Sequence, residues 1–257
     1  MRPEEPSPTT PSSWRPPPGV RVLVMMPAFN EERNIRHSIE TVRRDAPYAD
    51  VVVVDDGSRD HTARLAREAS ATVITLPVNL GIFDAIHTAF IYACRKGYDA
   101  AVQVDADGQH QPSEIPVILG PVLDGTADVV IGSRYLEKRG YKTPLSRRMG
   151  MILFASVTSA LIGRRVTDTT CGFRAYSREA IAAFASETGV DALDAVGLVI
   201  LGRAGYRILE VPATVHTRLT GRSSINLVRS VVYPFVALLS LIPVLLNRRL
   251  VRPRPQP

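Results

Sequence analysis

The chain has 257 residues, 45% of them hydrophobic, which is enough to build the core of one large α/β domain or of two small ones. Its formal net charge of +6 is compatible with nucleic acid, a membrane surface or an acidic substrate as partner. The basic residues gather beside apolar segments, at 147–148, 164–165 and 248–254, which favours a membrane surface. No nucleic-acid-binding signature is present, so we expect no nucleic-acid partner.

The N-terminal segment and the cysteines suggest no chemistry. Residues 1–19 are rich in Pro, Ser and Thr and lack the apolar region of a signal peptide, so we expect a disordered tail. Cys94 and Cys171 have no metal-site spacing and are expected to be reduced thiols of a cytoplasmic protein.

After the tail, the pattern alternates between strands and helices. Strands are expected at 20–29, 50–56, 71–77 and 99–107, and helices at 30–46, 58–70 and 81–97. The first helix places Ile35, Ile39 and Val42 on one face, and Ser58 or Asp60 is expected to cap the second helix. The alternation predicts an α/β fold with a parallel sheet covered by helices on both faces.

The second half of the chain is less regular and more apolar. Strands are expected at 127–134 and 206–218, and helices at 149–163 and 191–205. The helix at 149–163 is flanked by arginine pairs, so it fits either a membrane interface or the protein core.

The last apolar segment, 231–246, is shorter than the roughly 20 residues that span a bilayer, and Pro234 and Pro243 interrupt it. Arg248 and Arg249 follow it directly. We expect a re-entrant or interfacial hairpin here, or alternatively a contact in a homo-oligomer.

Polar residues follow four of the predicted strands, at the edge where an open parallel sheet binds ligands. They occur in the sequences PAFNE (27–31), DDGS (55–58), DADGQH (105–110) and GSR (132–134). If the strand continues that far, Asp105 and Asp107 point to the same face. Two adjacent carboxylates repel unless a cation lies between them, and Mg²⁺ or Mn²⁺ shared with a diphosphate fits. The alternative is a solvated loop cap.

The stretch VQVDADGQHQPSEI (102–115) resembles the family 2 glycosyltransferases, which have the nucleotide-diphospho-sugar transferase fold called GT-A. Further blocks resemble that family in the same order: MPAFNEERNI (26–35), VVVDDGSRDHT (52–62), NLGI (79–82), GSR (132–134), DTTCGFRAY (168–176) and EVPATVHTRLTGRSS (210–224). The most similar subgroup is that of dolichol-phosphate mannose synthase and related polyprenyl-phosphate sugar transferases. The resemblance implies a mostly parallel sheet flanked by helices, with membrane-associated helices at the C-terminus.

The resemblance implies a nucleoside pocket at the ends of the first two strands. Pro27, Phe29 and Glu31 would line it, with an aromatic edge for the base and a carboxylate for the ribose hydroxyl groups. Asp56 would accept a hydrogen bond from the base. Asp55 would support the turn, or alternatively cap the following helix.

The resemblance also implies a site for the diphosphate and its metal ion. Asp105 and Asp107 would bind Mg²⁺ or Mn²⁺, and Asp107 counts among the catalytic residues. Gln109 would contact phosphate or acceptor, and His110 would do the same or be an ordinary loop histidine. Arg134 would bind a phosphate of the donor or the acceptor, unless it is only a surface charge.

A glycine-containing loop follows, in which Arg218, Arg222 and Ser223 would fold over the diphosphate and neutralise the leaving group. Asp194 is the best candidate for a general base, or is a surface acid. Phe83 and Asp84 stand where the family commonly has small residues, which alters the expected shape of the nearby pocket.

We therefore expect residues 20–225 to form an inverting glycosyltransferase domain, followed by an apolar segment (226–249) and a basic tail (250–257). The expected reaction moves a hexose from GDP-mannose or a UDP-sugar to a polyprenyl (dolichyl-type) phosphate at the cytoplasmic face of the cell membrane. The alternatives are transfer to a saccharide hydroxyl in cell-surface or cell-wall glycan assembly, and a catalytically silent nucleotide-sugar-binding scaffold.

Overall fold

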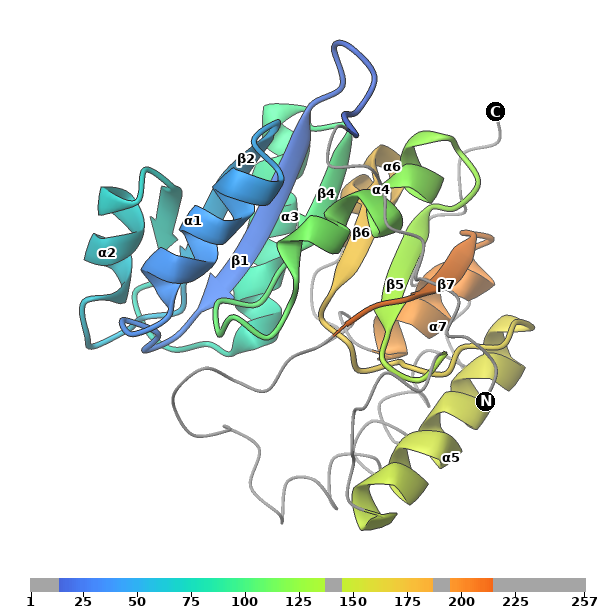
Figure 1. Cartoon of the computed structure of the whole chain (residues 1–257). Coiled ribbons are helices and arrows are strands. Elements are labelled where there is room, and N and C mark those ends of the chain that lie inside the picture. The colour runs from blue at the N-terminus through green and yellow to red at the C-terminus, as the bar shows by residue number, and fades with distance from the viewer. Residues whose placement is uncertain (1–13, 137–144, 187–194, 215–257) are drawn as a thin grey trace, which may run out of the picture.

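The computed structural model describes residues 14–136, 145–186 and 195–214 (Figure 1). Its centre is a seven-stranded sheet with the strand order β3-β2-β1-β4-β6-β5-β7. The strands are β1 (Val22–Ala28), β2 (Ala49–Asp55), β3 (Thr72–Thr75), β4 (Ala100–Gln103), β5 (Val129–Ser133), β6 (Arg174–Ser177) and β7 (Ile208–Pro212). The strand pairs are parallel except where β6 meets β4 and β5. The predicted α/β class and mostly parallel sheet are thus confirmed.

Helices cover both faces of the sheet (Figure 1). Within the described part of the chain they are α1 (Ile35–Asp45), α2 (Thr62–Glu68), α3 (Ile82–Lys96), the 3₁₀ turn η1 (Pro112–Glu114), α4 (Ile115–Leu123), α5 (Leu145–Ile162), α6 (Arg178–Ser186) and α7 (Ala195–Arg203). Helices α1 and α4 lie on one face, and α3 and α6 on the other. Helix α5 lies below the carboxyl ends of the strands, where it packs against α7.

The core follows from apolar runs that are buried on both sides of the sheet. The valines at 51–54, predicted as a buried strand, are 4% exposed or less, and β1 pairs with them in register from Val22↔Ala49 to Ala28↔Asp55. On the face of the sheet that α3 and α6 cover, the Phe90 ring of α3 stacks on Phe184 of α6 with centroids 4.8 Å apart. This packing places the carboxyl ends of β1, β2, β4 and β5 along one edge.

Strand β6 is the main departure from the sequence prediction. The expected strands and helices did not include β6, α6 or α4, and the alternation alone predicted a sheet that was parallel throughout. Because β6 runs antiparallel, the loop before it, and not the loop after it, lies at the carboxyl edge of its neighbours. The segment 168–173 therefore reaches the same edge as the polar strand ends.

Some strands and helices are shorter than the sequence predicted. Strand β4 ends at Gln103, four residues before the predicted end, so Asp105 and Asp107 lie in a loop. Helix α2 begins at Thr62, and neither Ser58 nor Asp60 occupies its N-cap position. Asp60 lies just before that position and accepts a hydrogen bond from the Thr62 backbone N–H at 2.9 Å. It also accepts one from the Glu32 N–H at 3.1 Å.

These contacts predict how stability depends on pH. Partial burial alone would raise the pKa of Asp60, but the hydrogen bonds from Thr62 and Glu32 outweigh it and lower the pKa. The unfolded chain then binds the proton more tightly, so this contribution is present above about pH 4 and is lost as the pH falls through the lowered pKa. We expect Asp60→Ala to cost about 1 kcal/mol of unfolding free energy at pH 7. Urea unfolding at pH 7 and pH 3 measures this, with Glu40→Ala on an exposed helical face as control. An equal loss at both pH values would contradict the prediction.

The predicted apolar segments are described only in part. The helix expected at 149–163 is present as α5, although it begins at Leu145. Within residues 14–136, 145–186 and 195–214, no helix is both long enough and apolar enough to cross a membrane. Segments 226–249 and 250–257 lie outside the described residues, as does most of the predicted N-terminal tail. The described chain begins at Trp14, whose ring contacts Tyr48 edge-on at 5.7 Å.

Candidate active site

The D-x-D carboxylates lie in the loop between β4 and η1. The backbone N–H of Asp105 donates to Nδ1 of His110 at 3.1 Å, and His110 Nε2 lies 3.7 Å from Asp105 Oδ2. The other carboxylate oxygen, Oδ1, is buried and has no hydrogen-bond partner among the described residues. Both carboxylate oxygens lie against Gly172, where a Cβ atom would be 2.9 Å from each. The carboxylate of Asp105 thus lies close against Gly172, with one oxygen unsatisfied.

Asp107 is 8% exposed and shapes the turn that follows it. Its Oδ1 accepts a hydrogen bond from the Gln109 N–H at 3.0 Å, across Gly108, whose φ of +75° suits glycine. Since both acids lie beyond the end of β4, strand alternation does not set their directions, contrary to the reasoning from sequence. Their predicted metal role still rests on their chemistry.

These residues fit a hard divalent cation whose remaining ligands come from elsewhere. Oxygen is the ligand that Mg²⁺ and Mn²⁺ prefer, and an unsatisfied buried carboxylate oxygen is costly unless something binds it. In the described part of the chain, no three His, Cys, Asp or Glu side chains form a metal-binding group. Among the described residues, a cation at Asp105 and Asp107 would thus have two carboxylate ligands, and phosphate oxygens and water are the kinds of ligand that complete such a shell.

The adjacent pair Asp55 and Asp56 closes two turns. Asp55 is buried, and its Oδ1 accepts from the Ser58 N–H at 3.2 Å, so it supports this turn and does not cap α2. The Asp56 carboxylate accepts hydrogen bonds from Asn79 Nδ2 (2.9 Å), Leu80 N–H (2.8 Å) and Gly81 N–H (2.9 Å). Asp56 therefore fixes the loop before α3. Its predicted hydrogen bond to a base remains a prediction.

The three residues predicted to line the nucleoside pocket lie at the end of β1. Pro27 pairs with Val54 in the sheet, and the Phe29 side chain projects into solvent, with the residue 43% exposed. Glu31 accepts a hydrogen bond from Asn34 Nδ2 at 2.7 Å. Because Asp56 N–H donates to the Ala28 carbonyl, the ends of β1 and β2 lie side by side.

Arg134, at the end of β5, forms a buried ion pair that the sequence did not predict. Its Nε and Nη2 donate to the two oxygens of Asp168, each at 2.7 Å, and its backbone N–H donates at 3.0 Å. Glu210 of β7 in turn accepts the Asp168 N–H at 2.6 Å. Burial alone would lower the pKa of Arg134, but the hydrogen bond and charge of Asp168 raise it overall. Burial, and then the charge of Asp168, raise the pKa of the Cys171 thiol to about 12, so this thiol stays protonated and inert.

The family of the chain is shown by comparison with known proteins. The sequence pattern of glycosyl transferase family 2 matches residues 23–184. The chain belongs to glycosyl transferase family 2. It is 33% identical to the undecaprenyl-phosphate mannosyltransferase of Micrococcus luteus, over 80% of this chain and 88% of that protein. It is also 33% identical to the polyprenol monophosphomannose synthase of Mycolicibacterium smegmatis, over 81% of this chain and 82% of that protein.

A solved structure agrees in fold with this family 2 chain. Glucosyl-3-phosphoglycerate synthase from Mycobacterium tuberculosis, crystallised with Mn²⁺ and uridine-diphosphate-glucose, superposes with a TM-score of 0.65 at 22% identity. The match covers 86% of this chain and 79% of that one. At this level of identity the likeness supports the GT-A fold of family 2, and nothing more about the chemistry.

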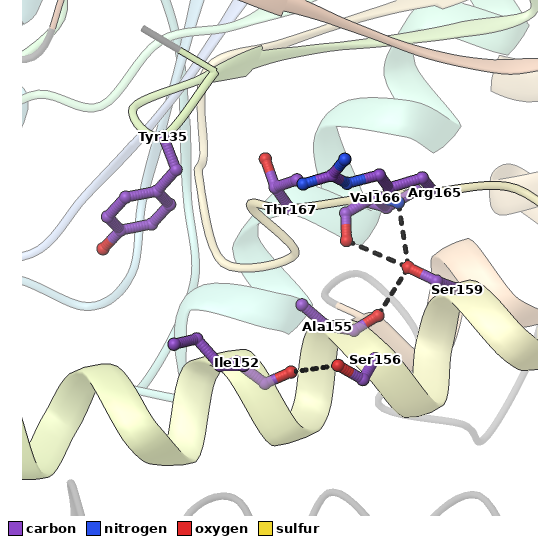
Figure 2. A pocket seen from close by; sticks show the side chains of 8 residues that line it. All are labelled: Tyr135, Ile152, Ala155, Ser156, Ser159, Arg165, Val166 and Thr167. Carbon is purple, nitrogen blue, oxygen red and sulfur yellow. Dashed lines mark hydrogen bonds between the residues drawn. The ribbon is translucent and has the colours of Figure 1, made fainter. Parts of the chain in front are cut away.

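A cavity of about 460 Å³ lies between α5 and residues 165–167 (Figure 2). Its lining includes Tyr135 and Thr167, which directly adjoin Arg134 and Asp168 in the chain. Ile152 and Ala155 contribute to its wall from α5, and the Tyr135 ring lies on the opposite side. The hydroxyl group of Ser156 donates to the Ile152 carbonyl (2.8 Å), and that of Ser159 to the Ala155 carbonyl (2.6 Å). The Ser159 hydroxyl also accepts a hydrogen bond from the Val166 N–H at 2.9 Å (Figure 2). Because both hydroxyl groups are used by backbone groups, the α5 wall presents mainly carbon.

Some predicted residues of the family 2 site lie outside the described residues: Asp194, Arg218, Arg222 and Ser223. The last described residue before the predicted arginine loop, Thr214, is held by Glu114 of η1 through its N–H (2.7 Å) and its hydroxyl (2.8 Å). Thr214 therefore lies next to η1, the turn that follows the D-x-D loop.

The prediction from sequence gave no role to Asp168, Gly172 or Glu210. All three lie in blocks that resemble the family, and this was the signal that could have singled them out.

Proposed function

We propose that this protein is an inverting glycosyltransferase that moves a hexose from a nucleotide-diphospho-sugar, GDP-mannose or a UDP-sugar, to a polyprenyl phosphate. The relatives from Micrococcus luteus and Mycolicibacterium smegmatis are named for transfer to polyprenyl-type phosphates, which supports this acceptor class. The observation that carries the proposal is the position of the largely apolar cavity, directly beside the strand end that bears Arg134.

The cavity suits an apolar chain with a charged head. Its α5 wall is mainly carbon, and Arg165 contributes a guanidinium group above it (Figure 2). A guanidinium group binds phosphate strongly, whereas a free sugar would require exposed hydroxyl and amide groups. Thr167, which also lines the cavity, uses its hydroxyl on Glu210. This distribution of groups favours a lipid phosphate over a saccharide.

The donor would lie at the neighbouring strand ends. Phe29 and Pro27 would contact the base, Glu31 the ribose, and Gln109 the diphosphate. Asp105 and Asp107 would hold Mg²⁺ or Mn²⁺, which when bound stabilises the negative charge of the departing diphosphate. The solved neighbour that contains Mn²⁺ and uridine-diphosphate-glucose has the same fold as this chain.

The reaction would be a single in-line displacement. An oxygen of the acceptor phosphate attacks the anomeric carbon and forms a new C–O bond. The bond from that carbon to the diphosphate breaks, and its electron pair leaves with the nucleoside diphosphate. Because a phosphate oxygen is already anionic near pH 7, no general base is needed, and Asp194 would not serve as one. Arg218, Arg222 and Ser223 would close over the leaving group and keep water out.

The acceptor requires that the protein work at a lipid surface. We propose peripheral attachment at the cytoplasmic face of the membrane, with α5 facing the lipid, since its Ile152 side chain is exposed at the cavity. The segment 226–249 would associate with the same membrane surface, or alternatively form a contact in a homo-oligomer.

Transfer of a radiolabelled hexose decides between the three functions. The purified protein is incubated with GDP-[¹⁴C]mannose or a labelled UDP-sugar, Mn²⁺ and undecaprenyl phosphate in detergent, and the label is then partitioned between chloroform–methanol and water. We expect the label to enter the organic phase only when the lipid is present. Label in a water-soluble saccharide would favour the alternative acceptor. Nucleotide binding without transfer to either acceptor would favour a scaffold.

A further inference from the structure

We propose that Gly172 and His110 are positioning residues that together hold the Asp105 carboxylate in the orientation needed to bind a divalent cation. This inference rests on the metal-dependent reaction proposed above. Under this proposal, neither residue binds the metal or the substrates itself. Both act through Asp105, Gly172 against its carboxylate and His110 on its backbone.

Gly172 provides the surface against which the carboxylate lies. A Cβ atom at this position would be 2.9 Å from both oxygens of Asp105 and 3.1 Å from Nε2 of Gln103. Gly172 is not among the residues with a positive φ, so its φ does not require glycine. The need for glycine here is therefore a need for space, and the group that fills this space is the carboxylate itself.

His110 fixes the other end of Asp105. Its Nδ1 accepts the Asp105 backbone N–H, so the neutral ring carries its proton on Nε2, which lies 3.7 Å from Asp105 Oδ2. The ring is buried and packs on Phe173, the residue after Gly172, with centroids 5.2 Å apart. The loop that bears His110 thus packs on the segment that bears Gly172 and Phe173. His110 accepts the backbone N–H of Asp105, and Gly172 lies against its carboxylate.

The consequence concerns metal affinity. A carboxylate that is already oriented loses less conformational freedom when it binds a cation, and groups that orient metal ligands typically contribute about 10- to 100-fold to affinity. The buried, unsatisfied Oδ1 of Asp105 shows that the orientation is not explained by hydrogen bonds within the described protein.

Alanine at position 172 separates this role from a contribution to folding. The atoms that a methyl group would displace are ends of side chains, which can move away, so we expect the variant to fold. We expect the Mn²⁺ affinity to fall by about 10- to 100-fold, with the melting temperature nearly unchanged. Affinity is measured from the electron paramagnetic resonance signal of free Mn²⁺, in the presence of GDP or UDP, whichever gives the larger thermal shift with the unmodified protein.

Three comparisons make the test specific. Gly120→Ala, in α4 with no atom within 4 Å of the added methyl group, should leave Mn²⁺ affinity unchanged. Gly172→Ala should have no further effect once Asp105 has been replaced by Ala, because the two changes act on one group. His110→Ala should weaken Mn²⁺ binding, and His110→Asn, which keeps an acceptor near the position of Nδ1, should restore most of it.

The outcomes distinguish this inference from the proposed function. If the unmodified protein binds no Mn²⁺, or if Asp105→Ala binds it equally well, the metal-dependent reaction fails. If Asp105→Ala weakens binding but Gly172→Ala does not, or if their effects add, the positioning role is wrong. If Gly172→Ala does not fold, the two His110 variants decide, and equal affinities for both would overturn the inference.

Discussion

Asp107→Asn is expected to lower kcat/KM for sugar transfer by about 100- to 1,000-fold, because it removes one of the two carboxylates proposed to hold the metal ion beside the leaving diphosphate. Asparagine has nearly the same shape and keeps an acceptor oxygen for the Gln109 N–H, so the turn across Gly108 should persist. The loss should therefore appear in turnover and in the Mn²⁺ requirement, and not in the melting temperature. Initial rates over a range of Mn²⁺ concentrations measure it.

Asp124 offers a matched control for this change. Its Oδ1 accepts the N–H of Thr126 at 2.8 Å, which is the same two-residue turn contact that Asp107 makes with Gln109. Asp124 lies after α4, away from the D-x-D loop, so Asp124→Asn should leave kcat/KM unchanged. If both variants lose activity equally, or neither does, Asp107 has no catalytic role.

Arg134→Ala is expected to destabilise the protein by about 3–5 kcal/mol, because it leaves the carboxylate of Asp168 buried without its cation. Asp168 is fully buried, and Arg134 supplies its backbone N–H and two guanidinium hydrogen bonds. The double variant Arg134→Met with Asp168→Asn removes both charges and should be markedly more stable than the sum of the single changes predicts. Urea unfolding monitored by circular dichroism gives the free energy of unfolding of Arg134→Ala, of Arg134→Met, of Asp168→Asn and of the double variant.

The exposed pair of Arg178 and Asp99 provides the comparison. The Arg178 side chain is 58% exposed, and solvent screens such a pair, so Arg178→Ala should cost less than about 1 kcal/mol. If Arg134→Ala costs no more than Arg178→Ala, the buried pair does not stabilise the fold.

The first half of the fold could be read from the sequence because its signals are local. The valines at 51–54 form one continuous apolar run, and the apolar face of α1 formed by Ile35, Ile39 and Val42 fits the helical period. Strand β6 has only four residues, and Pro121 lies inside α4, so neither offers a clear period. A four-residue antiparallel strand is specified by its neighbours in the sheet, and those lie far away in the sequence.

The candidate site, too, contains residues that the sequence identified and residues that it did not. Asp105 and Asp107 were identified because their spacing is visible in the chain. The pairing of Arg134 with Asp168 joins residues 34 positions apart, and the contact of Asp168 with Glu210 joins residues 42 apart. Only the order of strands β5, β6 and β7 brings these groups together, so sequence reasoning could name Arg134 but neither its partner Asp168 nor Glu210, which contacts Asp168.

The contact between Trp14 and Tyr48 has a practical consequence for spectroscopy. Trp14 is the only tryptophan of the chain, and Tyr48 precedes β2, whose opposite end bears Asp55. A strand of this length separates the indole from the ligand edge by about 20 Å. Tryptophan emission therefore reports the detachment of the N-terminal segment and global unfolding. The binding of nucleotides, which absorb in the ultraviolet, can be followed through a separate signal.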